Sequence, residues 1–256
     1  MDKKSLNKHI ETLKKKVFFT NTKWPHFEIL FDDLTKLSKL KKYKTIVSLE
    51  RGSLYGNISL FAPLFKKKNF ISLECSTKKI KSRGSYNKKY VKDDNIIKIP
   101  LSRHVNYKNL KLKKNFADLI IIPNLMHHIY DHHHLLKQCK SILKKGGDLY
   151  IFEPTLREIH QLPEDYFRFT PYGLKNILEK VGFKKISYDF SGGPFTAILY
   201  CIDQATQYLP KNKIGHFKKK FLIDFKELIK FDKFYKRNLV RKNTKFPMSF
   251  SIIAQV

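Results

Sequence analysis

The chain has few cysteines, few acidic residues and no long apolar run, and each of these scarcities excludes a class of protein. Its three cysteines, Cys75, Cys139 and Cys201, are odd in number and far apart among 256 residues, which suits neither a disulfide framework nor a zinc site. No apolar segment approaches the roughly 18 residues of a membrane-spanning helix, and the lysine-rich start lacks the apolar stretch of a signal peptide. We therefore expect a cytoplasmic protein whose thiols are reduced.

Acidic residues are scarce beside basic ones: 22 Asp and Glu against 52 Lys and Arg, a formal net charge of +30. Such a charge favours an anionic partner. Only seven of the basic residues are Arg, however, and the residues of A- and T-rich codons are all plentiful, so base composition accounts for much of the lysine. No arginine-rich or aromatic nucleic-acid module is recognisable. Nucleic acid is therefore not expected as a partner, while attraction to an anionic surface stays open.

Short β-rich runs alternate with helical patterns along most of the chain. The runs are continuously apolar, as in strands that are covered on both faces. They span residues 45–49, 70–74, 96–100, 117–123 and 147–154. Helices are predicted from Pro25 onward, between the fourth and fifth run with an end at Gly146 and Gly147, and from Pro171 to Gly182. This order predicts an α/β sheet with crossover helices.

The rhythm changes after the last of these helices. Residues 184–190 read as a strand, residues 192–210 and 216–240 as helices, and residues 246–256 as a closing strand. We interpret the two helices as an insertion before the last strand. The predicted division is a helical cap (1–42), a core (43–195), a helical lid (196–246) and the final core strand (247–256).

The first strand-to-helix turn is where an open α/β sheet is expected to bind a ligand. Its sequence, LERGSLYG, places Glu50, Gly52 and Gly56 in the frame acidic-x-G-x-G-x-G, with Leu54 where the middle glycine would stand. A dinucleotide fingerprint that begins at Gly52 fails at the same leucine. Glu74 ends the next strand, where a carboxylate can accept hydrogen bonds from both hydroxyls of a ribose. Taken singly these residues fit a turn and a solvated strand end, but their joint spacing favours a nucleoside cofactor.

Five motifs in order resemble the class I S-adenosylmethionine-dependent methyltransferases, specifically the type 11 methyltransferase domain. The resemblance covers about residues 43–195 and rests on LERGSLYG, LECS, FADLIIIPNLMHHI, LKKGGDLYIFEP and DYFRFTPYGLKNILEKVGF. It implies a Rossmann-like fold with a seven-stranded, mostly parallel sheet, a reversed last strand and helices on both faces. The segment DYFRFTPYGL also resembles methyltransferases associated with surface polysaccharides.

The same resemblance implies S-adenosylmethionine as the cofactor and assigns residues to it. Glu50, Gly52 and Gly56 would frame the methionine part, and Glu74 would hold the ribose. Pro123 and Asn124 would line the cofactor beside the fourth strand. Leu54 departs from the family pattern, and its side chain bears on the depth of the cofactor pocket.

Histidines follow the fourth strand and provide candidates for chemistry. They are His127, His128, His132, His133 and His134. No spacing among them matches a zinc site and no cysteine joins them, so no metal is expected. Methyl transfer requires alignment of the partners and removal of a proton from the acceptor, and an imidazole suits that task near neutral pH. The predicted proton acceptors are His127 and His160.

The loop after the fifth strand carries His160 and is predicted to contact the substrate through Glu153, Tyr166 and Arg168. An alternative interpretation is an internal salt-bridged cap, in which Arg168 pairs with Asp165 or Glu164.

The predicted function is methyl transfer to a small-molecule or glycan acceptor, a lipid-linked glycan included. The alternative is a non-catalytic member of the fold that uses its basic face as a binding or scaffold module. In the predicted lid, apolar positions recur at helical spacing with lysines between them: Phe217, Phe221, Phe225, Leu228 and Ile229. This pattern is typical both of contact with an anionic membrane surface and of packing on the sheet.

Overall fold

The structure is a computed structural model that describes part of the chain. The described residues are 25–40, 43–51, 61–65, 69–75, 103–210, 212–216, 227–232 and 246–256. The chain divides into two compact units. The larger unit comprises Phe31–Glu153, Ile159–Asp189 and Ser251–Val256, and the smaller comprises Met1–Leu30, Pro154–Glu158 and Phe190–Phe250. The four-part division drawn from the sequence stays a prediction.

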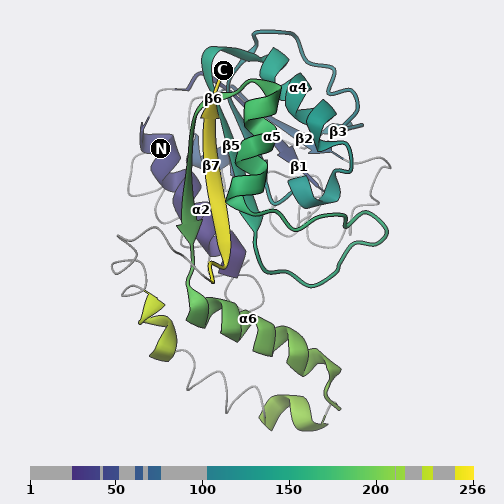
Figure 1. Cartoon of the computed structure of the whole chain (residues 1–256), viewed down its shortest axis with the longest axis vertical. Coiled ribbons are helices and arrows are strands. Elements are labelled where there is room, and N and C mark those ends of the chain that lie inside the picture. The colour runs from purple at the N-terminus through teal and green to yellow at the C-terminus, as the bar shows by residue number, and fades with distance from the viewer. Residues whose placement is uncertain are drawn as a thin grey trace, which may run out of the picture. The chain divides into compact units, whose positions relative to one another are not determined.

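A seven-stranded sheet with the order β3-β2-β1-β4-β5-β7-β6 forms the framework (Figure 1). Its strands are β1 (Thr45–Glu50), β2 (Asn69–Cys75), β3 (Arg103–Val105), β4 (Ala117–Pro123), β5 (Leu143–Pro154), β6 (Lys184–Ser191) and β7 (Ser249–Gln255). The pairs β1–β2, β1–β4, β2–β3 and β4–β5 are parallel. Because parallel strands end at the same edge, the carboxyl ends of β1, β2, β4 and β5 form one border of the sheet.

The last strand runs against its neighbour. At one end of β5, Val256 donates its N–H to the carbonyl of Gly147 and accepts a hydrogen bond from Gly146, each at 3.1 Å. At the other end, Thr155 donates its N–H to the carbonyl of Met248. This pairing makes β7 antiparallel to β5, and with the strand order it confirms the predicted class I methyltransferase fold.

The central strands are buried because the sheet is covered on both faces. Leu119, Ile120, Ile121 and Ile122 of β4 are all 0% exposed, which agrees with a strand that is apolar at every position. In Figure 1, α4 (His132–Ile142) and α5 (Pro171–Val181) lie in front of the sheet, and α2 (Pro25–Leu40) lies behind it. The apolar run of each central strand therefore indicated its two-sided burial correctly.

The ends of α5 follow from local sequence chemistry. Thr170 caps its beginning by accepting a hydrogen bond from the Gly173 N–H, and Pro171 occupies the first turn, where no N–H is needed. Gly182 ends the helix in the left-handed conformation at φ +91°. The prediction for this helix is confirmed at both ends.

The helix before β5 ends earlier than predicted. α4 stops at Ile142, not at Gly146 and Gly147, because Leu143 is extended and pairs with Ala117 of β4. The glycines lie in an irregularity of the strand, where the pairing moves from Leu143 to Asp148, and Gly146 has φ +75°. Sheet pairing thus outweighed the local helix-ending signal. The predicted strand at 96–100 lies outside the described residues, and the sequence did not indicate β3.

The smaller unit contains α6 (Pro194–Ala205), which confirms the first helix of the predicted insertion. Its N-terminus is capped from a distant segment: Asp232 accepts hydrogen bonds from the N–H groups of Phe195 and Thr196 at 3.1 and 3.0 Å. Gly193 is required there, because a Cβ would lie 2.4 Å from the Asp232 carboxylate. Most of the second predicted helix, 216–240, lies outside the described residues.

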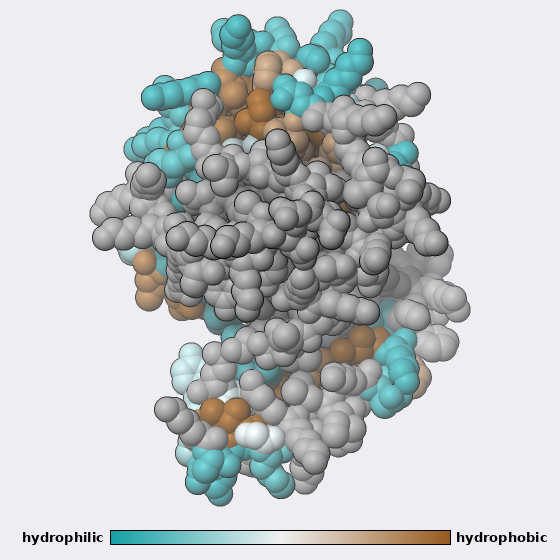
Figure 2. Space-filling model, turned by 180° about the vertical axis from the view of Figure 1, so that it is seen from behind, coloured by the Kyte–Doolittle hydropathy of each residue, from teal (hydrophilic) through white to brown (hydrophobic). Residues whose placement is uncertain are grey.

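The surface of the described part is mixed in polarity. On the face shown in Figure 2, hydrophilic side chains (teal) surround smaller apolar areas (brown). Within the described ranges, no helix has the length and apolar character needed to cross a membrane.

Candidate active site

Two carboxylates stand side by side where β1 and β2 end. Glu50 and Glu74 are register partners on the neighbouring strands, and they are 6% and 1% exposed. The Ser48 hydroxyl donates a hydrogen bond to Glu50 at 2.7 Å. The sequence predicted Glu50 correctly as the end of β1, whereas β2 continues one residue beyond Glu74, to Cys75. Gly52, Leu54 and Gly56 lie outside the described residues.

Asn124 follows β4 with an exceptional backbone conformation. Its φ is +56°, and its N–H donates to the carbonyl of Phe152 at 2.7 Å, which locks the turn after Pro123. Its side-chain Oδ1 is buried and has no hydrogen-bond partner among the described residues. An unsatisfied buried acceptor costs about 1–3 kcal/mol. A donor from a bound cofactor would satisfy this atom, so the residues present here fit a polar cofactor.

His127 forms a buried pair with Glu153. Its Nδ1 lies 2.6 Å from Glu153 Oε2, and both side chains are 1% exposed. A carboxylate can only accept, so Nδ1 carries a hydrogen, and in the neutral ring the lone pair is on Nε2. Nε2 is buried and no described residue hydrogen-bonds to it. This arrangement presents an imidazole, oriented by a carboxylate, at the carboxyl end of β4.

Glu153 also fixes the turn that carries His127. Its Oε1 accepts hydrogen bonds from the N–H groups of Leu125 at 2.9 Å and Met126 at 2.7 Å. These two amides lead into the 3₁₀ helix η3 (Met126–His128), whose first N–H groups have no partner within the helix. Glu153 was predicted to contact the substrate; in the structure its carboxylate instead orients His127 from within the protein.

His160 approaches the same place from the loop after β5. Its ring centroid lies 5.3 Å from that of His127 and 4.8 Å from that of His128. Asp165 holds the loop segment: its carboxylate accepts the His160 N–H at 2.9 Å and two bonds from the Arg168 guanidinium at 2.6 and 2.9 Å. The structure therefore brings both predicted proton acceptors together.

Asp165 and Arg168 form the internal salt bridge that was the alternative interpretation for this loop. Burial alone would raise the pKa of Asp165, but the hydrogen bonds from Arg168 and from the His160 amide outweigh it and hold that pKa well below its usual value. Arg168, predicted as a substrate residue, is thus engaged in fixing the loop.

Arg51 is a residue that the sequence analysis missed. Its Nη2 lies 2.6 Å from Glu164 Oε2, and its Nε donates to Gln161 Oε1 at 2.7 Å. These contacts tie the end of β1 to the loop that carries His160. The side chains of Arg51 and Glu164 are 7% and 18% exposed, so the pair is partly shielded from water. The available signal was an arginine directly after the strand that ends at Glu50, within LERGSLYG.

Exposed aromatic rings border the histidines. Tyr166 is 42% exposed and its N–H donates to the carbonyl of His127 at 2.9 Å. Its ring meets that of Tyr130, which is 68% exposed, edge-on with centroids 5.4 Å apart. The predicted substrate residue Tyr166 therefore lies next to His127 with an accessible ring.

We expect His128 to make folding stability depend on pH. Burial, followed by the neighbouring charges of His127 and Arg51, holds the pKa of His128 well below its ordinary value of about 6.5. Below about pH 6.5, His128 is protonated in the unfolded state but stays unprotonated in the folded state. The free energy of unfolding is therefore unaffected by the titration of His128 above about pH 6.5. As the pH falls further, it decreases by about 1.4 kcal/mol per pH unit.

Urea denaturation between pH 7.5 and 5 measures this slope. The variant His128→Asn keeps a donor for the Glu164 carbonyl but does not titrate, so its slope should be shallower than that of the wild type. His133→Asn, on the partly exposed side of α4, is the matched control and should keep the wild-type slope. Equal slopes for all three proteins would contradict the prediction.

Comparison with known proteins agrees with this geometry. Residues 49–151 match a family model described as a methyltransferase domain. No curated protein matches the chain. Three solved structures illustrate the likeness. An S-adenosylmethionine-dependent methyltransferase from Thermotoga maritima, described as a possible histamine N-methyltransferase, is 12% identical with a TM-score of 0.52, covering 96% of this chain and 97% of its own.

The other two structures have similar scores. The phosphoethanolamine N-methyltransferase 2 of Haemonchus contortus, solved with S-adenosyl-L-methionine, is 14% identical with a TM-score of 0.50, covering 90% of this chain and 51% of its own. The [4+2]-cyclase SpnF is 14% identical with a TM-score of 0.53, covering 88% of this chain and 80% of its own. At these identities the likeness establishes the fold alone.

The chain has the fold of the class I S-adenosylmethionine-dependent methyltransferases, and a methyltransferase-domain model matches residues 49–151 of its 256 residues. More specifically, the model that residues 49–151 match is that of the type 11 methyltransferase domain, as the motifs in the sequence indicated. The cofactor is S-adenosylmethionine.

Proposed function

We propose that this methyltransferase acts on a small-molecule or glycan acceptor and that His127 accepts the proton the acceptor loses. The observation that carries the proposal is the His127–Glu153 pair. It presents a buried imidazole that a carboxylate holds through Nδ1 and whose Nε2 has no partner in the described part of the chain, one turn after Asn124 at the sheet border. A general base needs a ring that is oriented in this way with one nitrogen available for the proton.

Each residue of the border has a defined task in the proposal. Bound S-adenosylmethionine supplies an electrophilic methyl group on its sulfonium. Glu74 holds the ribose hydroxyls, Glu50 frames the methionine part together with Gly52 and Gly56, and Asn124 accepts a hydrogen bond through its buried Oδ1 beside Pro123. His127 Nε2 takes the proton of the acceptor, and Glu153 stabilises the imidazolium that forms.

His160 is the second candidate for the proton acceptor in this proposal. It lies near His127, on a loop that Asp165 and Arg168 hold in place. A base on this loop would take the proton of an acceptor that binds on the side of β5. Substitution of each histidine separately distinguishes the two.

The proposed acceptor class is supported by the exposed aromatic rings beside the histidines. Tyr130 and Tyr166 offer exposed ring faces and hydroxyl groups next to the histidines. Tyrosine combines an apolar body with a polar tip, which suits an acceptor with apolar faces and hydroxyl edges, as a sugar has. Arg168 contributes by fixing the loop that positions Tyr166.

Loss of the Glu74 carboxylate tests the cofactor side of the proposal. We expect Glu74→Ala to weaken binding of S-adenosylhomocysteine by about 10- to 100-fold, because charged hydrogen bonds contribute about 1.5–3 kcal/mol. Isothermal titration calorimetry on the folded proteins measures this. Glu179→Ala, which removes a half-exposed carboxylate on α5, is the control and should bind as the wild type does.

An unchanged affinity in folded Glu74→Ala would refute the assignment of the ribose to this residue. Failure of the wild type itself to bind would refute the cofactor assignment and favour the non-catalytic scaffold.

The proposal includes a lid formed by residues 196–246 that leans on an anionic membrane surface. Lysines between apolar positions at helical spacing support it. Phe217, Phe221 and Phe225 lie outside the described residues, so the support comes from sequence pattern. Such contact would suit a lipid-linked glycan as the acceptor.

A further inference from the structure

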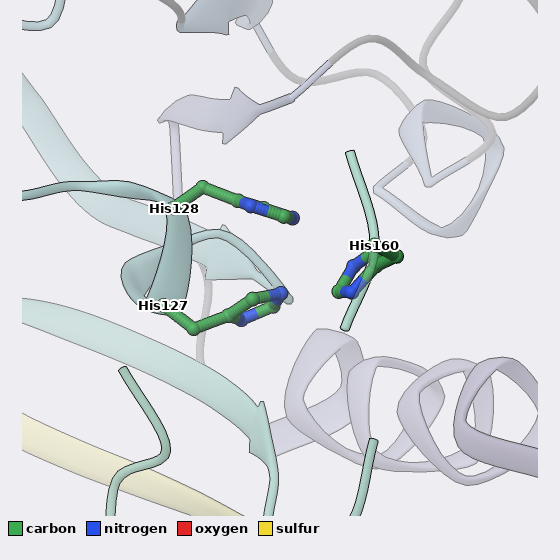
Figure 3. A group of neighbouring side chains, drawn as sticks. All are labelled: His127, His128 and His160. Carbon is green, nitrogen blue, oxygen red and sulfur yellow. The ribbon is translucent and has the colours of Figure 1, made fainter. Parts of the chain in front are cut away.

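Three imidazoles from two segments meet in the larger unit. The rings of His127 and His128 project from η3 toward His160, whose ring faces them from the loop after β5 (Figure 3). Each side chain offers one ring nitrogen, and these nitrogens all lie within 4.8 Å of one another. His127 and His128 are 1% and 3% exposed, so the cluster is largely shielded from solvent.

In each of the three rings, Nδ1 lies close to an oxygen that can accept a hydrogen bond. Nδ1 of His127 lies 2.6 Å from the Glu153 carboxylate, and Nδ1 of His128 lies 2.5 Å from the carbonyl of Glu164. Nδ1 of His160 lies 3.2 Å from the Asp165 carboxylate. Metal-ligating histidines are held in this way, since the bond at one nitrogen fixes the tautomer and leaves the lone pair of the other for the ion.

The fixed charges around the cluster favour a bound cation. The surrounding groups include three carboxylates, on Glu153, Glu164 and Asp165, against the guanidinium groups of Arg51 and Arg168. The fixed charges around the three rings are therefore negative in sum.

We propose that His127, His128 and His160 form a binding site for a divalent transition-metal ion of the zinc class. Imidazole suits zinc and its neighbours, and three histidines leave a fourth position open in a tetrahedral site. Zinc–nitrogen bonds of 2.0–2.1 Å would place the nitrogens about 3.3 Å apart, so the rings close by on the order of 1 Å on binding. The sequence analysis expected no metal, because no spacing among the histidines after the fourth strand matches a zinc site and no cysteine joins them.

One consequence rests on the proposed function. A metal ion bound to Nε2 of His127 occupies the lone pair that would take the acceptor's proton. The metal and the proton compete for the same atom, so the metal-loaded protein is expected to be inactive in methyl transfer. The cluster then acts as an inhibitory metal site within the active site.

Titration of tag-free, chelator-treated protein with Zn²⁺ against a chromophoric chelator tests the site. We expect one equivalent to bind. His160→Asn and His128→Asn should each weaken binding by more than about 100-fold, since loss of an outer-shell partner alone costs about 10- to 100-fold. His133→Asn removes a histidine outside the cluster and should bind as the wild type does. Co²⁺ should give the intense visible absorption of a four-coordinate complex.

Circular dichroism establishes that each variant is folded. If either His128→Asn or His160→Asn fails to fold, the other variant still tests the site. Absence of stoichiometric binding, or equal binding by wild type, His128→Asn and His160→Asn, would overturn the metal site whatever the activity of the protein. Stoichiometric binding that depends on these histidines supports it. If zinc binds in this way and methyl transfer continues, the metal site stands and the base role of His127 fails.

Discussion

Replacing His127 by Asn is expected to lower the turnover of methyl transfer by about two to four orders of magnitude, the usual contribution of a positioned general base. The asparagine amide retains a donor for Glu153 near the position of Nδ1, so the buried pair is preserved. It has no counterpart of Nε2, so the proton acceptor is lost. The affinity for S-adenosylhomocysteine should stay at the wild-type value, because the change does not touch Glu50 or Glu74.

The measurement is steady-state turnover on an acceptor drawn from a panel of hydroxylated sugars and small molecules. His133→Asn is the matched control and should keep wild-type turnover. A fall in kcat with an unchanged KM would indicate an interaction used in the transition state. If turnover survives in His127→Asn but falls in His160→Asn, the base is His160. If it survives in both, alignment of the partners suffices for catalysis.

The second large effect is expected from Glu153→Ala, which should lower the free energy of unfolding by about 3–5 kcal/mol. The carboxylate is 1% exposed and accepts hydrogen bonds from the Leu125 and Met126 amides and from His127. Each buried donor left without a partner costs about 1–3 kcal/mol. Urea denaturation at pH 7.5 measures the change, with Glu179→Ala on the surface of α5 as the control.

Glu153→Gln separates the structural task of this residue from its task at His127. Both backbone amides donate to Oε1, so a glutamine carbonyl placed there keeps them satisfied, and the loss of stability should be about half that of Glu153→Ala or less. The glutamine amide group would face Nδ1 and donate to it. The hydrogen of His127 then moves to Nε2, which removes the lone pair.

The expected signature of Glu153→Gln is therefore a mild loss of stability with a severe loss of turnover. A destabilisation as large as that of Glu153→Ala would contradict the bonding arrangement at Oε1. Wild-type turnover in the glutamine variant would show that the tautomer of His127 is not used in the reaction.

Local patterns in the sequence determined most of the framework. Continuous apolar runs at β1, β2, β4 and β5 predicted strands covered on both faces, and burial is complete along β4. Thr170, Pro171 and Gly182 specified the ends of α5, because capping and left-handed φ act within a few residues. Glu50 and Glu74 could be placed at the sheet border, since each directly ends an apolar run. These features depend on neighbours in the chain, so the sequence alone shows them.

Tertiary structure decided how the border became a site. The end of α4 depended on the pairing of Leu143 with Ala117, and Glu153 proved to be the partner of His127, a residue 26 positions away. Arg51 meets Gln161 across 110 positions, which brings the loop of His160 to the end of β1. No periodicity records such contacts, because they depend on the path of a loop and on which buried charges find each other. The sequence therefore determined which residues stand at the border, and only the fold decided that three imidazoles meet there.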